Sequence, residues 1–211
     1  YTGMRSYFRK SHTKEVVDKA EAVLTETGLI KLRDKRASDV SLGYLRRLEI
    51  ARVLVTEPEL IMLDEPCAGL SNFAINEVTE LVMKLKAQKK SIVLIEHNLP
   101  ITMKVCDRIM VLSYGKKKDL FVSYGMMEVL HGISLNVQTG ELVSVIGPNG
   151  AGKTTLIKTI MGLVQPKSGA VLYDGQDISH IPAHKRAEMG IGYVPEGRHV
   201  FGRLTVEENL G

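Results

Sequence analysis

The sequence has no tryptophan, and only 5% of its 211 residues are aromatic. It has no apolar run of about 18 residues, which a transmembrane helix needs, so we expect membrane contact only through partner subunits. The first residues, Tyr1 to Arg5, are not typical of a signal peptide. No internal repeat or low-complexity stretch is present. These absences argue against an integral membrane protein and against a repeat architecture.

Cysteine is scarce as well. The two cysteines, Cys67 and Cys106, show no metal-ligand spacing, and we expect a reducing, cytoplasmic compartment. The formal net charge is +4, with basic residues spread along predicted helices, as at residues 33–36. This pattern favours solvated faces over a nucleic-acid patch, so we expect no nucleic-acid partner. A chain of this length can bury one substantial α/β core.

One stretch carries a clear chemical signal. The apolar run 142–146 is followed by a glycine-rich loop and then by an apolar, helix-like segment. Glycines let backbone N–H groups close around phosphates, and the following helix directs its positive end at the ligand. Lys153 would contact the β- and γ-phosphates, and the Thr154 hydroxyl would bind Mg²⁺. The stretch therefore predicts a site for ATP and Mg²⁺, made by Gly147, Pro148, Asn149, Gly150, Ala151, Gly152, Lys153, Thr154 and Thr155.

The acidic partners of this loop come before it in the chain. Leu60 to Leu63 form a short apolar run that ends in Asp64 and Glu65. Asp64 would hold Mg²⁺, and Glu65 would orient or deprotonate the water that attacks the γ-phosphate. Four aliphatic residues followed by two acids are also typical of any strand that leaves a core, so this pattern gains its meaning from its neighbours.

Upstream, the pattern of residues 41–54 predicts a short segment with polar residues and glycine that is followed by an amphipathic helix. The segment resembles the signature motif of ATP-binding cassette (ABC) proteins, in which a serine, a glycine amide and a helix N-terminus hold the γ-phosphate of the opposite cassette. The family pattern LSGGQ is here Val40-Ser41-Leu42-Gly43-Tyr44, so Ser41 and Gly43 match and Tyr44 departs. An alternative reading is a surface helix with Ser41 as its N-cap, which is compatible with that function.

Three further positions take their roles from the same resemblance. His97 matches the histidine that contacts the γ-phosphate and couples it to Glu65. Tyr124 matches the aromatic residue that stacks on adenine. Glu196 stands where the family has the Q-loop glutamine, which contacts Mg²⁺ and the attacking water, and a carboxylate there can still bind a cation.

The resemblance is strongest to the ATP-binding subunits of branched-chain amino-acid importers. Residues 1–117 resemble the back part of one such cassette, with the helical subdomain, signature, Walker B strand and switch histidine. Residues 118–211 resemble the front part of another, with the aromatic A-loop, the phosphate loop and the Q-loop. Two explanations fit this permuted order. The chain is a stretch of a tandem protein, or it is a circularly permuted cassette.

The resemblance implies an α/β P-loop fold with a doubly wound, mainly parallel sheet, a small antiparallel part and a helical subdomain. It implies an ATPase at the cytoplasmic face of the membrane, which pairs with a second cassette and with permease subunits. Two alternatives remain: a soluble ABC ATPase without a permease, and a binding-only fragment of a tandem protein. We expect helices at about 14–32, within 41–54, and at about 74–88 and 99–105, a hairpin near 172–175, and a capping box between Thr205 and Glu208.

Overall fold

The computed structural model describes residues 14–112, 121–124, 127–131, 133–197 and 199–210, with backbone only at 121–124, 127–129 and 131. The chain forms two compact units. The first comprises residues 1–57, 69–81 and 197–211, and the second comprises residues 58–68 and 82–196. Each unit therefore combines residues from before and after position 117. None of the described helices combines the length and the apolar character that a membrane-spanning helix requires.

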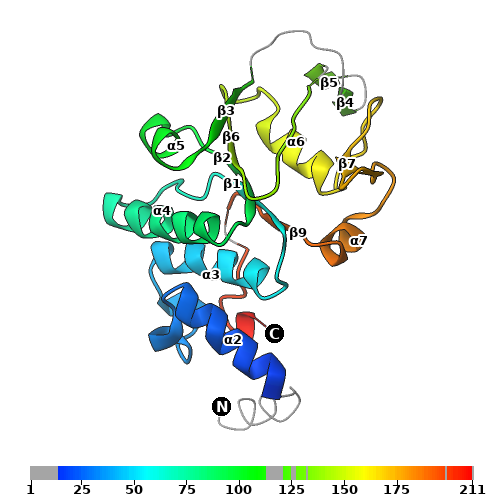
Figure 1. Ribbon diagram of the computed structural model, residues 1–211. Helices are drawn as coiled ribbons and strands as arrows, with labels where there is room; N and C mark the ends of the chain where they lie inside the picture. Colours follow the sequence, from blue (N-terminus) through cyan, green and yellow to red (C-terminus); the bar gives the residue numbers. More distant parts are fainter. Residues whose placement is uncertain (1–13, 113–120, 125–126, 132, 198, 211) are drawn as a thin grey trace. The chain divides into compact units, whose positions relative to one another are not determined.

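A five-stranded parallel sheet organises the second unit (Figure 1). Its spatial order is β3-β6-β2-β1-β9, so β6, which comes late in the chain, lies between β3 and β2. Strands β1, β2, β6 and β9 are short and largely buried, as expected for parallel strands that are covered on both faces, whereas the edge strand β3 is mostly exposed. Their bounds are β1 (Leu60–Asp64), β2 (Ser91–Ile95), β3 (Arg108–Val111), β6 (Leu142–Ile146) and β9 (Ile191–Val194).

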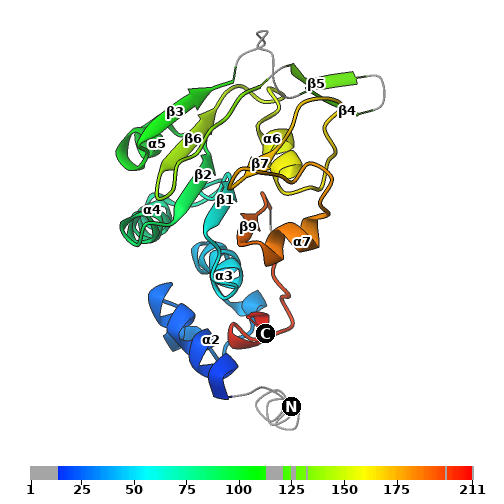
Figure 2. The same cartoon turned by 45° about the vertical axis from the view of Figure 1, so that its right-hand side comes forward.

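Helices cover both faces of this sheet. Helix α5 (Leu99–Val105) and helix α6 (Lys153–Ile160) lie on opposite faces in Figures 1 and 2. Leu156 and Ile157 of α6 belong to the buried cluster that also contains Val93 of β2 and Val145 of β6. Apolar side chains of both strands pack against one face of α6. Their burial holds the helix against the sheet, and so holds the loop that precedes α6 at the edge of the sheet.

Two small antiparallel hairpins complete the second unit. Strands β4 (Phe121–Tyr124) and β5 (Met127–His131) form one, and strands β7 (Leu172–Tyr173) and β8 (Gln176–Asp177) form the other. The turn at Asp174 and Gly175 has φ of 49° and 77°, as a two-residue hairpin loop requires. The predicted fold class, an α/β sheet that is mainly parallel with a small antiparallel part, is confirmed.

Arg186 holds the segment around helix α7 (Ala183–Glu188). Its side chain is fully buried and donates hydrogen bonds to four backbone carbonyls. Two of these carbonyls lie at the end of α6: that of Ile160, and that of Thr159, which also accepts from the Gly162 amide at 3.1 Å. A guanidinium suits this task because its donors are fixed in a planar fork.

The first unit is helical. It contains α2 (Lys14–Glu26), α3 (Leu42–Leu54), the first part of α4 (Asn72–Ala87) and the short 3₁₀ turns η1 (Ile30–Leu32), η2 (Ala37–Asp39) and η3 (Glu207–Asn209). The expectation of one helix over 14–32 is wrong at its end. Gly28 adopts a left-handed conformation with φ of 70°, and the Leu29 amide bonds back to the Leu24 carbonyl at 2.7 Å. This motif terminates the helix at Glu26.

The predicted capping box is confirmed within this unit. The Glu208 amide donates to Oγ1 of Thr205 at 3.1 Å, and the Thr205 amide donates to Oε2 of Glu208 at 2.8 Å. The cap precedes η3, a single turn, rather than a long helix.

Candidate functional site

The phosphate loop, residues 147–152, connects the end of β6 to the first residue of α6. Gly150 and Gly152 have φ of 81° and 92°, in the region that favours glycine. At Gly147 a Cβ atom would lie 2.6 Å from the Leu112 carbonyl oxygen, so the end of β3 excludes any side chain there. The loop therefore exposes backbone to a ligand and ends on the free N–H groups of a helix.

Lys153 folds back over this loop. Its ammonium donates to the carbonyl oxygens of Gly147 at 3.0 Å and Pro148 at 3.2 Å, and the residue is buried. An ammonium group has three donors, so these two bonds leave one for an anion. The side chain is thus held beside the loop amides, where a phosphate would add to its partners.

Thr154 meets Asp64 at the carboxyl edge of the sheet. Oγ1 of Thr154 donates to Oδ1 of Asp64 at 3.3 Å. Asp64 is fully buried, and this burial raises the pKa of its carboxyl group, against the opposing effect of the Thr154 hydrogen bond. Glu196 and Glu65 lie close enough to raise the pKa of Asp64 further. A cation at this place would offset the cost of the buried negative charge.

The donor set fits Mg²⁺ bound together with a phosphate. Hydroxyl and carboxylate oxygens are the ligands that Mg²⁺ prefers, and it commonly uses only one or two protein carboxylates besides phosphate oxygens and water. Among the described residues, no group of three or more His, Cys, Asp and Glu side chains is spaced to hold a metal ion by itself. Thr154 and Asp64 would hold the ion, which would neutralise phosphate charge.

Tyr193 is a site residue that sequence reasoning did not select. Its hydroxyl donates to Oδ2 of Asp64 at 3.4 Å. β9 pairs with β1 so that Tyr193 stands opposite Met62, two residues before Asp64 and therefore on the same face of the sheet. The hydroxyl thus orients the second carboxylate oxygen. The sequence contained no signal for this pairing, because strand order was not predictable from it.

Glu65 and His97 lie next to each other. Oε2 of Glu65 lies 3.5 Å from Nδ1 of His97, whose side chain is 61% exposed. Glu65 has φ of 47°, which is rare for a residue with a side chain, and its amide donates to the Ile95 carbonyl at 3.0 Å. Backbone strain of this kind persists where surrounding contacts fix it, commonly at functional sites.

The other predicted residues of the second unit are placed less completely. Glu196 follows β9, is exposed, and raises the pKa of Asp64 through its charge. The backbone of Tyr124 lies on β4, but its side chain lies outside the described residues. Its contact with adenine stays a prediction.

The signature residues lie in the first unit, at the beginning of α3. Ser41 occupies the N-cap position, but its side chain makes no capping hydrogen bond and the residue is exposed. Gly43 is buried, and a Cβ atom there would lie 2.8 Å from Cβ of Ala74. The glycine is therefore required for the packing of α4 on α3, whatever else it does.

Tyr44, which departs from the family pattern, has a defined partner. The guanidinium carbon of Arg47 lies 4.5 Å from the centre of the Tyr44 ring. Arg47 in turn pairs with Glu77 at 3.3 Å and donates to the Thr27 carbonyl at 3.3 Å. Such a cation–π contact limits the ring to one side of α3.

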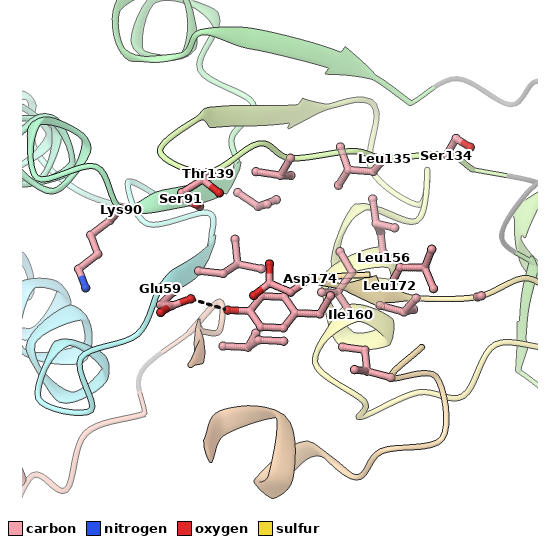
Figure 3. Close-up of a pocket in the computed structure, with 18 of the residues that line it drawn as sticks. Glu59, Lys90, Ser91, Ser134, Leu135, Thr139, Leu156, Ile160, Leu172 and Asp174 are labelled. Atoms are coloured by element: carbon pink, nitrogen blue, oxygen red, sulfur yellow. Dashed lines mark hydrogen bonds between the residues drawn. The ribbon is translucent and has the colours of Figure 1, made fainter. Parts of the chain in front are cut away.

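A separate cavity of about 560 Å³ lies at the other end of the sheet. It is lined by the first residues of strands, such as Leu60, Ser91 and Ile191, whereas the phosphate loop follows the last residue of β6. Figure 3 shows Glu59 at its edge, where the carboxylate accepts a weak hydrogen bond from the Tyr173 hydroxyl at 3.4 Å. It is therefore distinct from the phosphate loop.

Comparison with known families agrees with the geometry of the site. The family model described as ABC transporter matches residues 4–68 and 130–209, which together are more than half of the chain. The chain belongs to the ABC transporter family. The prediction made from the phosphate loop and the signature motif is confirmed at this level.

Relatives of this ABC chain differ in what their names say they transport. It is 30% identical to the nucleoside import ATP-binding protein NupA of Lactococcus lactis over 247 aligned positions, which cover 95% of the chain and 48% of NupA. It is 48% identical over 87 positions to the high-affinity branched-chain amino acid transport ATP-binding protein BraG of Pseudomonas aeruginosa, covering 41% of the chain and 37% of BraG.

A third relative is the lipopolysaccharide export system ATP-binding protein LptB of Haemophilus influenzae, 47% identical over 93 positions that cover 44% of the chain and 39% of LptB. Among solved structures, the ADP conformation of MJ1267, an ATP-binding cassette of an ABC transporter, is 33% identical, with a TM-score of 0.43 over 48% of this chain and 41% of that one. The chain spans less than half the length of these relatives.

Proposed function

We propose that this chain binds MgATP at the phosphate loop and hydrolyses it as the ATPase part of an ABC transporter. The observation that carries the proposal is the contact between Thr154 and Asp64, with Lys153 folded over the same loop. A triphosphate on the loop amides would reach the Lys153 ammonium, and Thr154 and Asp64 would hold a Mg²⁺ ion that neutralises phosphate charge. Tyr124 would stack on the adenine.

Hydrolysis would depend on Glu65 and His97. The Glu65 carboxylate would accept a proton from the water in line with the γ-phosphate, and His97 would contact that phosphate and hold Glu65 in place. The distance of 3.5 Å between Oε2 of Glu65 and Nδ1 of His97 supports this pairing. Glu196 would contact the metal ion or the attacking water from the end of β9.

A second cassette would complete the site. Ser41 and Gly43 would contact the γ-phosphate held by that cassette, and a Ser41 side chain that makes no capping hydrogen bond at the α3 N-terminus is compatible with this role. ATP would favour the closed pair, and only this difference in affinity between closed and open forms could drive a permease. Such partners would place the chain at the cytoplasmic face of the membrane.

For the cargo, we propose branched-chain amino acids. Two observations support this class of cargo. The sequence around the signature motif and after the phosphate loop resembles the ATP-binding subunits of such importers, and the chain is similar to BraG. NupA and LptB, whose names give nucleosides and lipopolysaccharide, are relatives too. Transport assays with the permease partners and each of these cargoes would separate the classes. A soluble ABC ATPase without a permease is the alternative if no permease pairs with the chain.

For the motif order, we propose that residues 1–117 and 118–211 derive from the back of one cassette and the front of another. The single alignment with NupA, which runs through 95% of this chain, supports an order shared with a longer protein. The sheet supports a further step: β6 and β9 from the later part pair with β1, β2 and β3 from the earlier part. The two parts would thus share one hydrophobic core. We therefore favour a working ATPase over the alternative of a fragment that only binds nucleotide.

Thermal unfolding of the purified chain with and without excess MgATP tests nucleotide binding. A ligand at 100 times its Kd adds about 2.7 kcal/mol to the folded state, which raises Tm by roughly 5 to 10 °C in a chain of this size. We expect Lys153→Ala to lose this shift. Lys158→Ala, on the same helix but away from the loop, should keep it. Absence of a shift in the unmodified chain would contradict the proposal.

A further inference from the structure

Two loops that follow neighbouring strands lie next to each other at the carboxyl edge of the sheet. β1 pairs with β2 so that Asp64 stands opposite Ile95. The next residues are Glu65 on one side and Glu96 and His97 on the other. The Glu65 amide donates to the Ile95 carbonyl at 3.0 Å, which continues the ladder by one bond.

Glu96 adds a second link between these loops. Its side chain is only 1% exposed, and Oε1 accepts a hydrogen bond from the Cys67 amide at 3.0 Å. Cys67 lies two residues after Glu65, and the turn between them is closed by the bond from the Ala68 amide to the Glu65 carbonyl at 3.1 Å. The carboxylate of Glu96 therefore fixes the far side of the turn that begins at Glu65.

This link bears on the strained backbone of Glu65. A φ of 47° in a residue with a side chain requires contacts that hold it from both directions. The Ile95 carbonyl holds Glu65 itself, and Glu96 holds the turn two residues later. Without the second contact, the turn could relax, and the Glu65 carboxylate would leave its place beside His97.

Core packing alone does not account for a glutamate at position 96. A buried carboxylate is costly unless its oxygens are bonded, and Oε2 of Glu96 has no hydrogen-bond partner among the described residues. An apolar residue would fill the same volume without that cost. What an apolar residue lacks is the acceptor for the Cys67 amide.

We infer that Glu96 is a positioning residue, whose carboxylate anchors the Cys67 amide and thereby holds Glu65 in register with His97. The inference rests on the proposed ATPase function for its effect on hydrolysis. The anchor itself is a property of the fold and can be measured without nucleotide.

The test uses Cys67 as a probe of the turn. The chain has only two cysteines, so Cys106→Ser leaves Cys67 as the single thiol. Glu96→Gln keeps an oxygen acceptor, whereas Glu96→Met has similar length and no acceptor. We expect the Gln variant to protect buried Cys67 from a thiol reagent as the parent does. The Met variant should react about tenfold faster or more, because the turn opens locally.

The ATPase assay is the second readout. The Glu96→Met variant should lose roughly 10- to 100-fold in kcat, the effect of a small displacement of a reacting group. Its KM for ATP should change less than about threefold, because the phosphate loop is untouched. The Gln variant should retain most of kcat. A general loss of structure would instead lower Tm and affect both kinetic constants.

Equal labelling rates in the Met variant and the parent would overturn the inference, as would a Gln variant labelled as fast as the Met variant. If the Met variant does not fold, hydrogen exchange of the Cys67 amide in the unmodified chain decides: slow exchange supports the anchor, and exchange at the unprotected rate refutes it. A chain that follows the labelling order but hydrolyses no ATP would refute the proposed function and leave the anchor supported.

Discussion

The hydroxyl of Thr154 donates a hydrogen bond to Oδ1 of Asp64 at 3.3 Å, although 90 positions separate the two residues in the chain. Asp64 precedes the phosphate loop in the sequence. The two residues nevertheless meet because the order of the strands in the sheet brings the end of β1 close to the start of α6. β6 lies two strands from β1, and α6 begins at their common carboxyl edge. Residues far apart in the sequence thus meet at one edge of the sheet, in an arrangement that is compatible with the proposed metal–phosphate site.

Asp64→Asn should weaken MgATP binding while it stabilises the ligand-free fold at neutral pH. Burial raises the pKa of Asp64 in the folded state, so the folded state binds the proton more tightly than the unfolded state. The contribution of this group to the free energy of unfolding is therefore greatest at low pH and falls as pH rises through the raised pKa. Urea unfolding across this pH range measures it.

The control for that experiment is Asp174→Asn, in the exposed turn of the β7-β8 hairpin. This variant should keep both the pH dependence of the parent and the MgATP effect. A less stable Asp64→Asn protein at neutral pH would contradict the argument.

Glu65→Gln should bind MgATP and fail to hydrolyse it. An amide has no basic oxygen to take a proton from water, so we expect kcat to fall by about 10² to 10⁴. Steady-state phosphate release and nucleotide binding, measured in parallel, check the two parts. Glu188→Gln, at an exposed position on α7, is the matched control. Full-rate hydrolysis by Glu65→Gln would rule out the assigned base.

Gly43→Ala should destabilise the chain by about 1 to 3 kcal/mol, because the added Cβ would lie 2.8 Å from Cβ of Ala74. Adding Ala74→Gly removes the clash, so the double variant should be more stable than Gly43→Ala alone. Gly202→Ala is the control, since the nearest contact of its Cβ among the described residues beyond its chain neighbours would be Cβ of Ser38 at 3.8 Å. Chemical denaturation gives all the values. A double variant no more stable than the single one would mean that the contact is not the cause.

Arg186→Met should lower the free energy of unfolding by about 3 kcal/mol or more, because four carbonyls would lose the buried guanidinium as a donor and, among the described residues, only that of Thr159 would keep a backbone partner, the Gly162 amide. Arg186→Lys should recover only part of this loss, because an ammonium cannot reproduce the planar fork. Lys185→Met, at the exposed neighbouring position, should change stability by less than about 0.5 kcal/mol. Similar values at 185 and 186 would show that the buried bonds contribute little.

The sequence contained enough to predict several local elements, whereas the roles of the predicted site residues stay predictions. The glycine spacing of the phosphate loop and the apolar segment after it are local signals, and they predicted that a helix follows the loop, as α6 does. The observed bounds of α5 also agree with the expected ones. The end of α2 was predicted too late. Apolar residues recur at helical spacing on both sides of Gly28, so the sequence pattern did not show where the helix ends. The left-handed backbone at Gly28 ends the helix, and the apolar residues beyond it belong to the separate 3₁₀ turn η1.

The long-range parts of the site were not predictable in the same way. Tyr193 and Glu96 act through residues on neighbouring strands, and which strands are neighbours depends on the packing of the whole sheet. Periodicity indicates that a strand is buried, but it does not indicate that β6 enters between β3 and β2. The roles of Tyr124 and Ser41 come from family resemblance and stay predictions.

Titration calorimetry of ATP into this chain, with Mg²⁺ and then with a chelator, is the most direct test of the central claim that Thr154 and Asp64 share one metal–nucleotide site. We predict that one ATP binds per chain. The affinity should fall at least about tenfold when Mg²⁺ is removed, and by as much in Asp64→Asn; a tenfold loss corresponds to about 1.4 kcal/mol of binding free energy. Binding of equal strength in Asp64→Asn, or no binding by the unmodified chain, would contradict it.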